Sequence, residues 1–116
     1  MRVALLAGSG LYASKLEEYV EAHPEAGITI VWAVTEPGAV LASLDHDPEV
    51  FLLDMRWRHE ALEAARLLKE AGVPLIIGLF EWLDDTLIPA ARSAGVEVVQ
   101  AGTCWGTVIT RIKAAG

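Results

Sequence analysis

The sequence predicts one α/β domain, a doubly wound five-stranded parallel sheet with helices on both faces. Five apolar runs alternate with five segments of helical period along the 116 residues. Such alternation builds right-handed βαβ units and a parallel sheet. The run from Val50 to Leu53 stays apolar until Asp54, as expected of a strand covered on both faces. The strands are expected at 3–7, 28–34, 50–54, 74–80 and 96–100, and the helices at 11–23, 37–44, 59–71, 84–94 and 104–114.

The first two helices follow from their apolar stripes and the residues that end them. Helical spacing in the segment 11–23 directs one stripe to the sheet: Tyr12, Leu16, Tyr19, Val20 and His23. Pro24 and Gly27 end this helix. Pro37 opens a short second helix, where its missing N–H costs nothing, with an expected buried edge of Val40, Leu41 and Leu44.

The later helices carry clear stop and start signals. Leu62, Ala65 and Leu68 form the inner stripe of the third, and Gly72 with Pro74 ends it. A proline inside a helix costs ~3 kcal/mol, so the regular part of the fourth should begin near Leu87 or Ile88, just before Pro89. Thr103 is expected to cap the last helix.

Composition narrows the classes of function. The net charge of −7 disfavours a nucleic-acid partner. No apolar run approaches the ~20 residues that cross a bilayer, so we expect no membrane span. The single cysteine, Cys104, excludes an internal disulfide and favours a reducing, cytoplasmic setting. The histidines lie singly in separate segments, so we expect neither a metal site nor a cofactor.

The residues at the strand ends are the candidates for function, because ligands of open parallel sheets bind beyond the carboxyl ends of the strands. These residues are Gly8, Ser9 and Gly10, then Thr35 and Glu36, Asp54, the segment from Gly78 to Glu81, and the segment from Gln100 to Thr103.

With these residues the chain resembles the receiver domains of two-component response regulators. The resemblance covers nearly the whole chain: five βα repeats, an aspartate closing the third strand, and the turn from Ala71 to Pro74 before the fourth. The run from Leu52 to Arg56 is the most specific local match. The resemblance implies a CheY-like, flavodoxin-like sheet of strand order 2-1-3-4-5, with Asp54 at the position of the phosphoacceptor.

The phosphorylation site of such receivers is incomplete here. Phosphorylated receivers have an acidic pair after the first strand, a Ser or Thr after the fourth and a Lys closing the fifth. A carboxylate accepts a phosphoryl group only when a metal offsets the repulsion between the anions. The resemblance therefore implies a degenerate receiver in which Asp54 is inactive. The expected degenerate pocket consists of Gly8, Ser9, Gly10, Gly78 and Gln100.

Two features have competing interpretations. Asp54 either accepts a phosphoryl group or, as we favour, caps backbone N–H groups or pairs with Arg56 or Arg58; Asp54→Asn should then change stability by only ~0.5–1.5 kcal/mol. The turn from Gly8 to Gly10 either cradles a phosphate or is a tight strand-to-helix turn. We favour the turn, because Asp54 would place a negative charge beside any phosphate there.

Cysteine and tryptophan residues also follow the strand ends. Cys104 lies near a helix start, but no histidine follows it in the chain, so we do not expect a nucleophile. Trp57, Trp82 and Trp105 each follow a strand at the same edge of the sheet. They either fill the degenerate pocket or form an interface, where tryptophan is enriched.

We expect a non-catalytic, phosphorylation-independent receiver-like module that binds another protein or a second copy. The alternatives are an active receiver phosphorylated on Asp54, and a flavodoxin-like small-molecule or nucleotide binder that uses the turn from Gly8 to Gly10. A weak homodimer or partner site is expected on the face of the last two helices, where some apolar residues should lie at the rim. These residues are Leu87, Ile88, Trp105, Ile109 and Ile112.

The end of the sequence leads to a further expectation about the whole protein. Gly116 follows the last helix closely, so we expect the N-terminal part of a longer protein with a downstream domain. Atypical receivers of this kind begin the pilus-assembly ATPases of the tight-adherence (Tad/Cpa) system, which resemble the ParA/MinD ATPases. The comparison implies a role in pilus assembly or localisation.

Overall fold

The computed structural model describes residues 1–80, 86–100 and 105–115. Its sheet has five parallel strands in the order β2-β1-β3-β4-β5, which confirms the predicted fold. The strands are β1 (Arg2–Leu6), β2 (Thr29–Val34), β3 (Val50–Asp54), β4 (Leu75–Phe80) and β5 (Glu97–Gln100). β3 is central and buried along its whole length, as its unbroken apolar sequence predicts.

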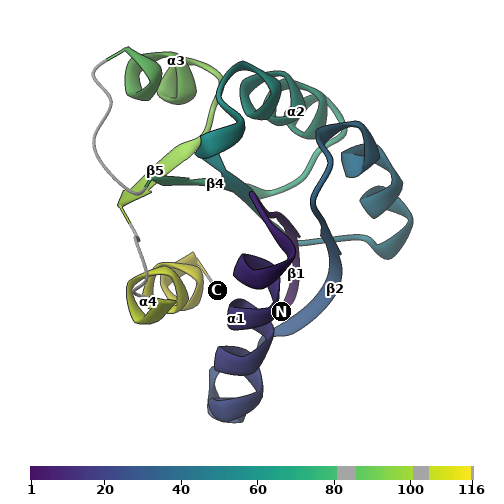
Figure 1. Ribbon diagram of the computed structural model, residues 1–116, viewed down its shortest axis with the longest axis vertical. Helices are drawn as coiled ribbons and strands as arrows, with labels where there is room; N and C mark the ends of the chain where they lie inside the picture. Colours follow the sequence, from purple (N-terminus) through teal and green to yellow (C-terminus); the bar gives the residue numbers. More distant parts are fainter. Residues whose placement is uncertain (81–85, 101–104, 116) are drawn as a thin grey trace.

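Helices cover both faces of the sheet, and each face has its own core. The α-helices are α1 (Gly10–Ala22), α2 (His59–Glu70), α3 (Leu87–Ser93) and α4 (Trp105–Ala115). Figure 1 shows α1 and α4 below the sheet and α2 and α3 above it. Because side chains alternate along a strand, Phe51 and Leu53 enter the core under α2, whereas Val50 and Leu52 enter the core over α1 and α4.

The described residues also form three 3₁₀ segments: η1 (Pro24–Ala26), η2 (Pro37–His46) and η3 (Met55–Trp57). The predicted second helix is therefore a 3₁₀ segment, and the expectation that Leu41 is buried is wrong, since 47% of it is exposed. With about three residues per turn, Val40 and Ser43 lie on the same side and face inward, which turns Leu41 outward. The Ser43 hydroxyl donates to the Val40 carbonyl at 2.7 Å, which satisfies it in its buried position.

The predicted helix ends agree with the structure where it describes them. Gly72 has a φ of 89°, the left-handed conformation that glycine adopts most easily, and it follows α2. Pro89 is the third residue of α3, which begins at Leu87 as the proline required. Thr103, Cys104 and Trp82 lie outside the described residues, and so do the expectations for them.

Candidate functional site

The candidate site lies at the carboxyl end of β3, around the buried carboxylate of Asp54, which is 3% exposed. Oδ1 accepts a hydrogen bond from the backbone N–H of Arg56 at 3.0 Å, and Asp54 thereby caps η3. Oδ2 accepts one from the backbone N–H of Gly8 at 2.9 Å. Each oxygen therefore accepts a hydrogen bond from a backbone N–H, one in the segment after β3 and one in the turn after β1.

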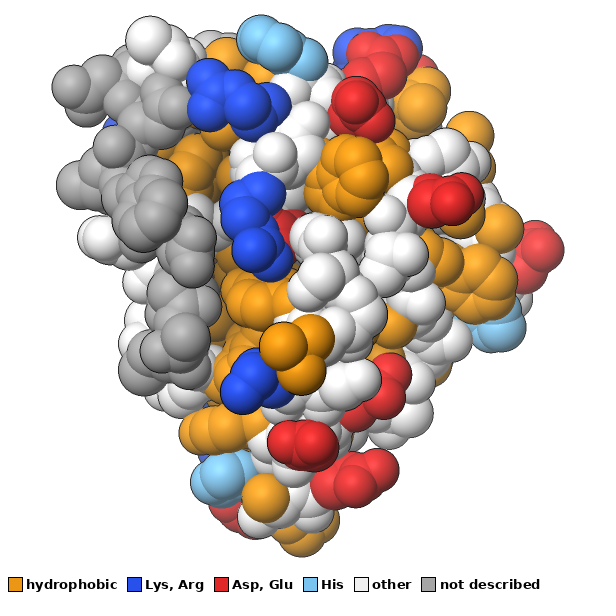
Figure 2. Space-filling view, in the orientation of Figure 1, with side chains coloured by type: hydrophobic (Ala, Val, Ile, Leu, Met, Phe, Trp, Pro, Cys, Tyr) orange, Lys and Arg blue, Asp and Glu red, His pale blue; other side chains and the backbone are white. Residues whose placement is uncertain are grey.

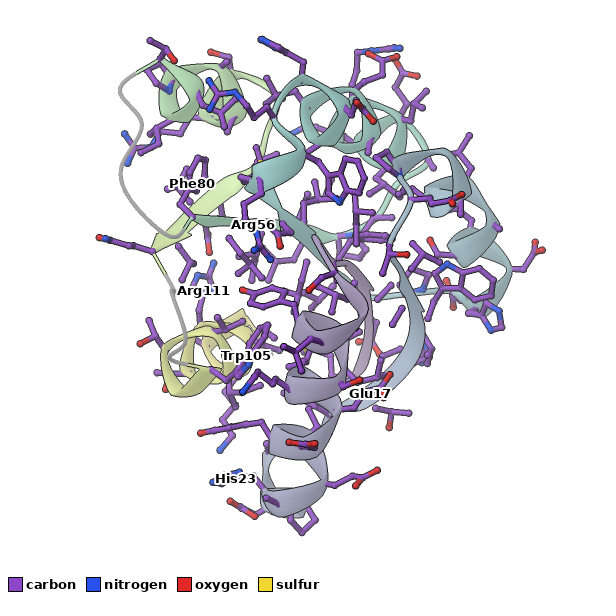
Figure 3. All side chains as sticks on the ribbon, in the orientation of Figure 1. Glu17, His23, Arg56, Phe80, Trp105 and Arg111 are labelled. Carbon is purple, nitrogen blue, oxygen red and sulfur yellow. The ribbon has the colours of Figure 1, made fainter. Side chains whose placement is uncertain are left out.

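Arg56 adds a charged partner to the same two oxygens. Its Nε donates to Oδ1 at 3.1 Å and to Oδ2 at 3.0 Å, and its Nη2 donates to Oδ2 at 2.7 Å. The Arg56 side chain is half-exposed, so the pair is buried at the carboxylate and open to water at the guanidinium. Figure 3 shows Arg56 in the middle of the face, and Figure 2 shows basic side chains in a row there. Asp54 is thus both a cap and an ion-pair partner, the arrangement favoured from the sequence.

Gly8 makes room for this ion pair. A Cβ atom at this position would lie 2.6 Å from Oδ2 of Asp54 and 2.7 Å from Nη2 of Arg56. Either distance is a collision, so a side chain here would displace the carboxylate or the guanidinium. Gly8, in the turn after β1, and Arg56, two residues after Asp54, are therefore two parts of one arrangement.

The rest of the first turn is used by the chain itself. Ser9 is the N-cap of α1, and its hydroxyl accepts the backbone N–H of Tyr12 at 3.2 Å. The Gly8 N–H is bonded to Asp54, which places a carboxylate directly beside the turn, as expected. A Cβ at Gly10 would meet nothing within 4 Å. This geometry is that of a strand-to-helix turn, and a phosphate bound there would face the Asp54 charge.

Gly78, a member of the predicted pocket, lies within β4 and against the core. Gly78 lies two residues before the end of β4, and the residue paired with Asp54 is Leu79. A Cβ at Gly78 would lie 2.9 Å from Val96 and 3.1 Å from Met55, so core side chains fill the space beside this glycine. Gln100 ends β5 and is exposed at the carboxyl edge.

The predicted interface residues are all part of the monomer's core. Exposure is at most 9% for every one of the five, which are Leu87, Ile88, Trp105, Ile109 and Ile112. The expectation that some lie at the rim is wrong, because α3 packs its two residues into the core on one face of the sheet and α4 packs its three into the core on the other.

Trp57 also packs inside the domain. It is half-buried against the core under α2, and its indole N–H donates to the Ala7 carbonyl at 2.8 Å. It therefore joins the ends of β1 and β3, which agrees with the filling interpretation of the tryptophans rather than the interface one.

Tyr12 is a residue of the site that the sequence identified only as sheet-facing. The Arg56 guanidinium lies 5.1 Å from the centre of the Tyr12 ring, and that ring lies 4.9 Å from the ring of Trp105. Tyr12, Trp105 and Lys15 also line a groove of about 350 Å³ between α1 and α4. The signal in the sequence is an aromatic residue in the first turn after the strand end. Its partner Arg56 is distant in sequence, so that signal alone could not identify the contact.

Metal-ligand groups and membrane-spanning helices are both absent from the described part of the chain. Within residues 1–80, 86–100 and 105–115, no three His, Cys, Asp or Glu side chains are grouped as a metal ion would require. None of the described helices has the length and apolar character of a membrane crossing.

Receiver domains of response regulators are among the solved structures that have the same architecture. The response regulatory domain of mrkE from Klebsiella pneumoniae has 16% identity and a TM-score of 0.77, and the match covers 98% of this chain and 93% of that one. The signal receiver domain of NarL from Mycobacterium tuberculosis has 18% identity and a TM-score of 0.74, and the match covers 98% of this chain and 94% of that one. The response regulator domain of CheB from Thermotoga maritima has 15% identity and a TM-score of 0.73, and the match covers 99% of this chain and 89% of that one. No protein-family model and no curated protein matches the chain. These likenesses show the receiver fold.

Proposed function

We propose that this domain is a receiver-like protein-interaction module that works without phosphorylation and is not an enzyme. One observation carries the proposal: both oxygens of Asp54 are bonded to the Arg56 guanidinium while each also accepts a backbone N–H. The position at which an active receiver is phosphorylated is therefore occupied by partners from the chain itself.

The chemistry of phosphoryl transfer supports this proposal. An attacking carboxylate oxygen must be reachable, and the charge on the phosphoryl oxygens must be neutralised, which Mg²⁺ does in most such sites. Asp54 would have to release Arg56 before a donor could approach, and it would lose its main counter-charge by doing so. Gly8 supplies no carboxylate for a metal ion, and its missing side chain is what admits the arginine.

Mass spectrometry tests the proposal directly. After incubation with acetyl phosphate and Mg²⁺, the intact mass should be unchanged, and beryllofluoride with Mg²⁺ should leave the amide spectrum unchanged. Asp47→Asn is the matched control, because Asp47 is an exposed aspartate outside the site. A phosphoryl adduct that persists in Asp47→Asn and is lost in Asp54→Asn would restore the active-receiver alternative.

The proposal can be extended to the protein in which this module works. We extend it to a role as the N-terminal domain of a longer protein, of the kind that begins the tight-adherence pilus-assembly ATPases. The receiver fold and the altered site around Asp54 support this extension. Sequencing the reading frame beyond Gly116 tests it: a ParA/MinD-like ATPase region should follow, and its absence would refute the assignment.

A further inference from the structure

The outer edge of β2 is the feature that the proposed function leaves unused. β2 is the first strand of the sheet, so β1 pairs with one of its sides only. The Thr29 N–H donates to the Met1 carbonyl, and the Val34 carbonyl accepts from the Ala7 N–H, which turns these two residues toward β1. The backbone N–H and C=O groups of neighbouring strand residues point to opposite edges of the strand. Those of Ile30, next to Thr29, and of Ala33, next to Val34, therefore face away from β1. Within the described residues no hydrogen bond reaches them there.

This edge lacks the residues that usually protect such strands. Natural edge strands are commonly guarded by Lys, other charges, Pro or a β-bulge, and only the last of these is found here. The segment from Gly27 to Thr35 has no charged residue and no proline. A register shift opposite Val3 and Ala4 places a bulge at Val31 and divides the edge. Regular pairing holds on both sides of the bulge, at Thr29 and Ile30 and from Trp32 to Val34.

An acidic groove runs beside the first half of this edge. It lies between α1 and β2, holds about 350 Å³, and is lined by Glu17, Val20, Glu21, Ile28, Thr29 and Ile30. The three apolar residues of the lining are only half-buried, and the two carboxylates are exposed. Figure 3 shows Glu17 on the side of α1 nearest to β2, and Figure 2 shows red side chains over this part of the molecule. Among the described residues neither carboxylate has an ion-pair partner.

We propose that the β2 edge binds an extended segment of a partner protein in which basic and apolar residues alternate. The segment adds a strand to the sheet through the outward backbone groups of Ile30 and Ala33. Its basic side chains lie on the α1 face, where their aliphatic stems cover Val20 and their charged ends reach Glu17 and Glu21. Its apolar side chains lie on the opposite face, beside the half-buried Trp32, whose ring packs against that of His46 at 4.9 Å.

Charge selects a basic partner over a second copy of this chain. Antiparallel pairing of two β2 strands about a twofold axis normal to the sheet would bring the two α1 helices together on one face. Glu17 and Glu21 of each copy would then repel those of the other, on a chain whose net charge is already −7. A segment with lysine or arginine converts the same carboxylates into attractive partners. The proposal depends on the domain being an interaction module, but it does not depend on the state of Asp54.

The test uses a blocked octapeptide of alternating lysine and valine, added to the isotope-labelled protein. We expect amide shifts concentrated from Ile28 to Val34 and along the β2 side of α1. Glu17→Gln combined with Glu21→Gln should weaken binding about tenfold at low salt. The matched control combines Glu60→Gln with Glu70→Gln, which removes two charges from α2 on the opposite face and should leave the affinity unchanged.

Two further peptides separate strand addition from charge attraction alone. A peptide N-methylated at alternate residues along its pairing edge keeps its charges but cannot donate to β2, and it should bind at least tenfold more weakly. A peptide of alternating glutamate and valine should not shift the β2 amides. Equal binding of the methylated peptide, shifts away from β2, or no binding would overturn the proposal. Concentration-dependent β2 shifts in the protein alone would also overturn it, because the occupant would then be a second copy. The phosphorylation test is independent of all these outcomes.

Discussion

Replacing Asp54 with asparagine should destabilise the domain much more than an ordinary hydrogen-bond change. Oδ1 accepts the Arg56 N–H and Oδ2 accepts the Gly8 N–H. An asparagine has one oxygen and one NH₂ group, so in either orientation the NH₂ faces a backbone N–H. Flipping the amide cannot relieve this clash of two donors, and one backbone N–H loses its partner in a buried site.

The magnitude follows from these contacts. A buried donor left unsatisfied costs about 1–3 kcal/mol, and a hydrogen bond to a charged group contributes about 1.5–3 kcal/mol. Arg56 is half-exposed, so water replaces part of what it loses. We therefore expect Asp54→Asn to lower the free energy of unfolding by roughly 2–4 kcal/mol. The range of ~0.5–1.5 kcal/mol expected from the sequence treats Asp54 as one ordinary hydrogen bond, and the structure gives it several.

Urea unfolding followed by far-ultraviolet dichroism measures this difference. The denaturant dependence should stay the same, so the midpoint alone should move. Asp47→Asn, at an exposed ion pair with Arg2, is the control and should change the free energy of unfolding by less than about 1 kcal/mol. If the two variants differed by less than about 1 kcal/mol, the buried-donor reasoning would be refuted.

Three other predictions follow from the same structure. Gly8→Ala should lower the free energy of unfolding by about 1–3 kcal/mol, because the new methyl group displaces Asp54 or Arg56, and this cost should shrink in an Arg56→Met background; equal costs in both backgrounds would show that the guanidinium does not contribute to the collision. The hydrogen bond from Arg66 holds the pKa of Glu63 below its ordinary value, so its stabilising contribution is present above the unfolded-state pKa and is lost as the pH falls through the folded-state pKa. Carboxyl NMR should show the pKa of Glu63 rising in Arg66→Met, and an unchanged pKa would contradict the hydrogen bond between these two side chains. Trp105→Ala should lower stability by about 3–5 kcal/mol because the side chain is buried in the core, and a loss of dimer in sedimentation without loss of stability would instead support the homodimer predicted from the sequence.

The sequence by itself determined the architecture of the sheet. Its apolar runs have strand length, its helical segments have helical period, and the two alternate, which are local properties of consecutive residues. The start of α3 at Leu87 was equally local, since Pro89 tolerates few helix positions. The position of Asp54 at the end of a buried strand followed from one uninterrupted apolar run.

Only the tertiary structure decided how the edge of the sheet is used. Gly8 and Arg56 are far apart in sequence. No local pattern around either residue predicts that the absence of a side chain at Gly8 makes room for the guanidinium of Arg56. The burial of Trp105, Leu87 and Ile88 likewise depends on how α3 and α4 pack against the sheet. The physical reason is that periodicity specifies which face of an element is apolar. Which distant atoms meet that face is decided by packing and by the need of every buried polar group for a partner.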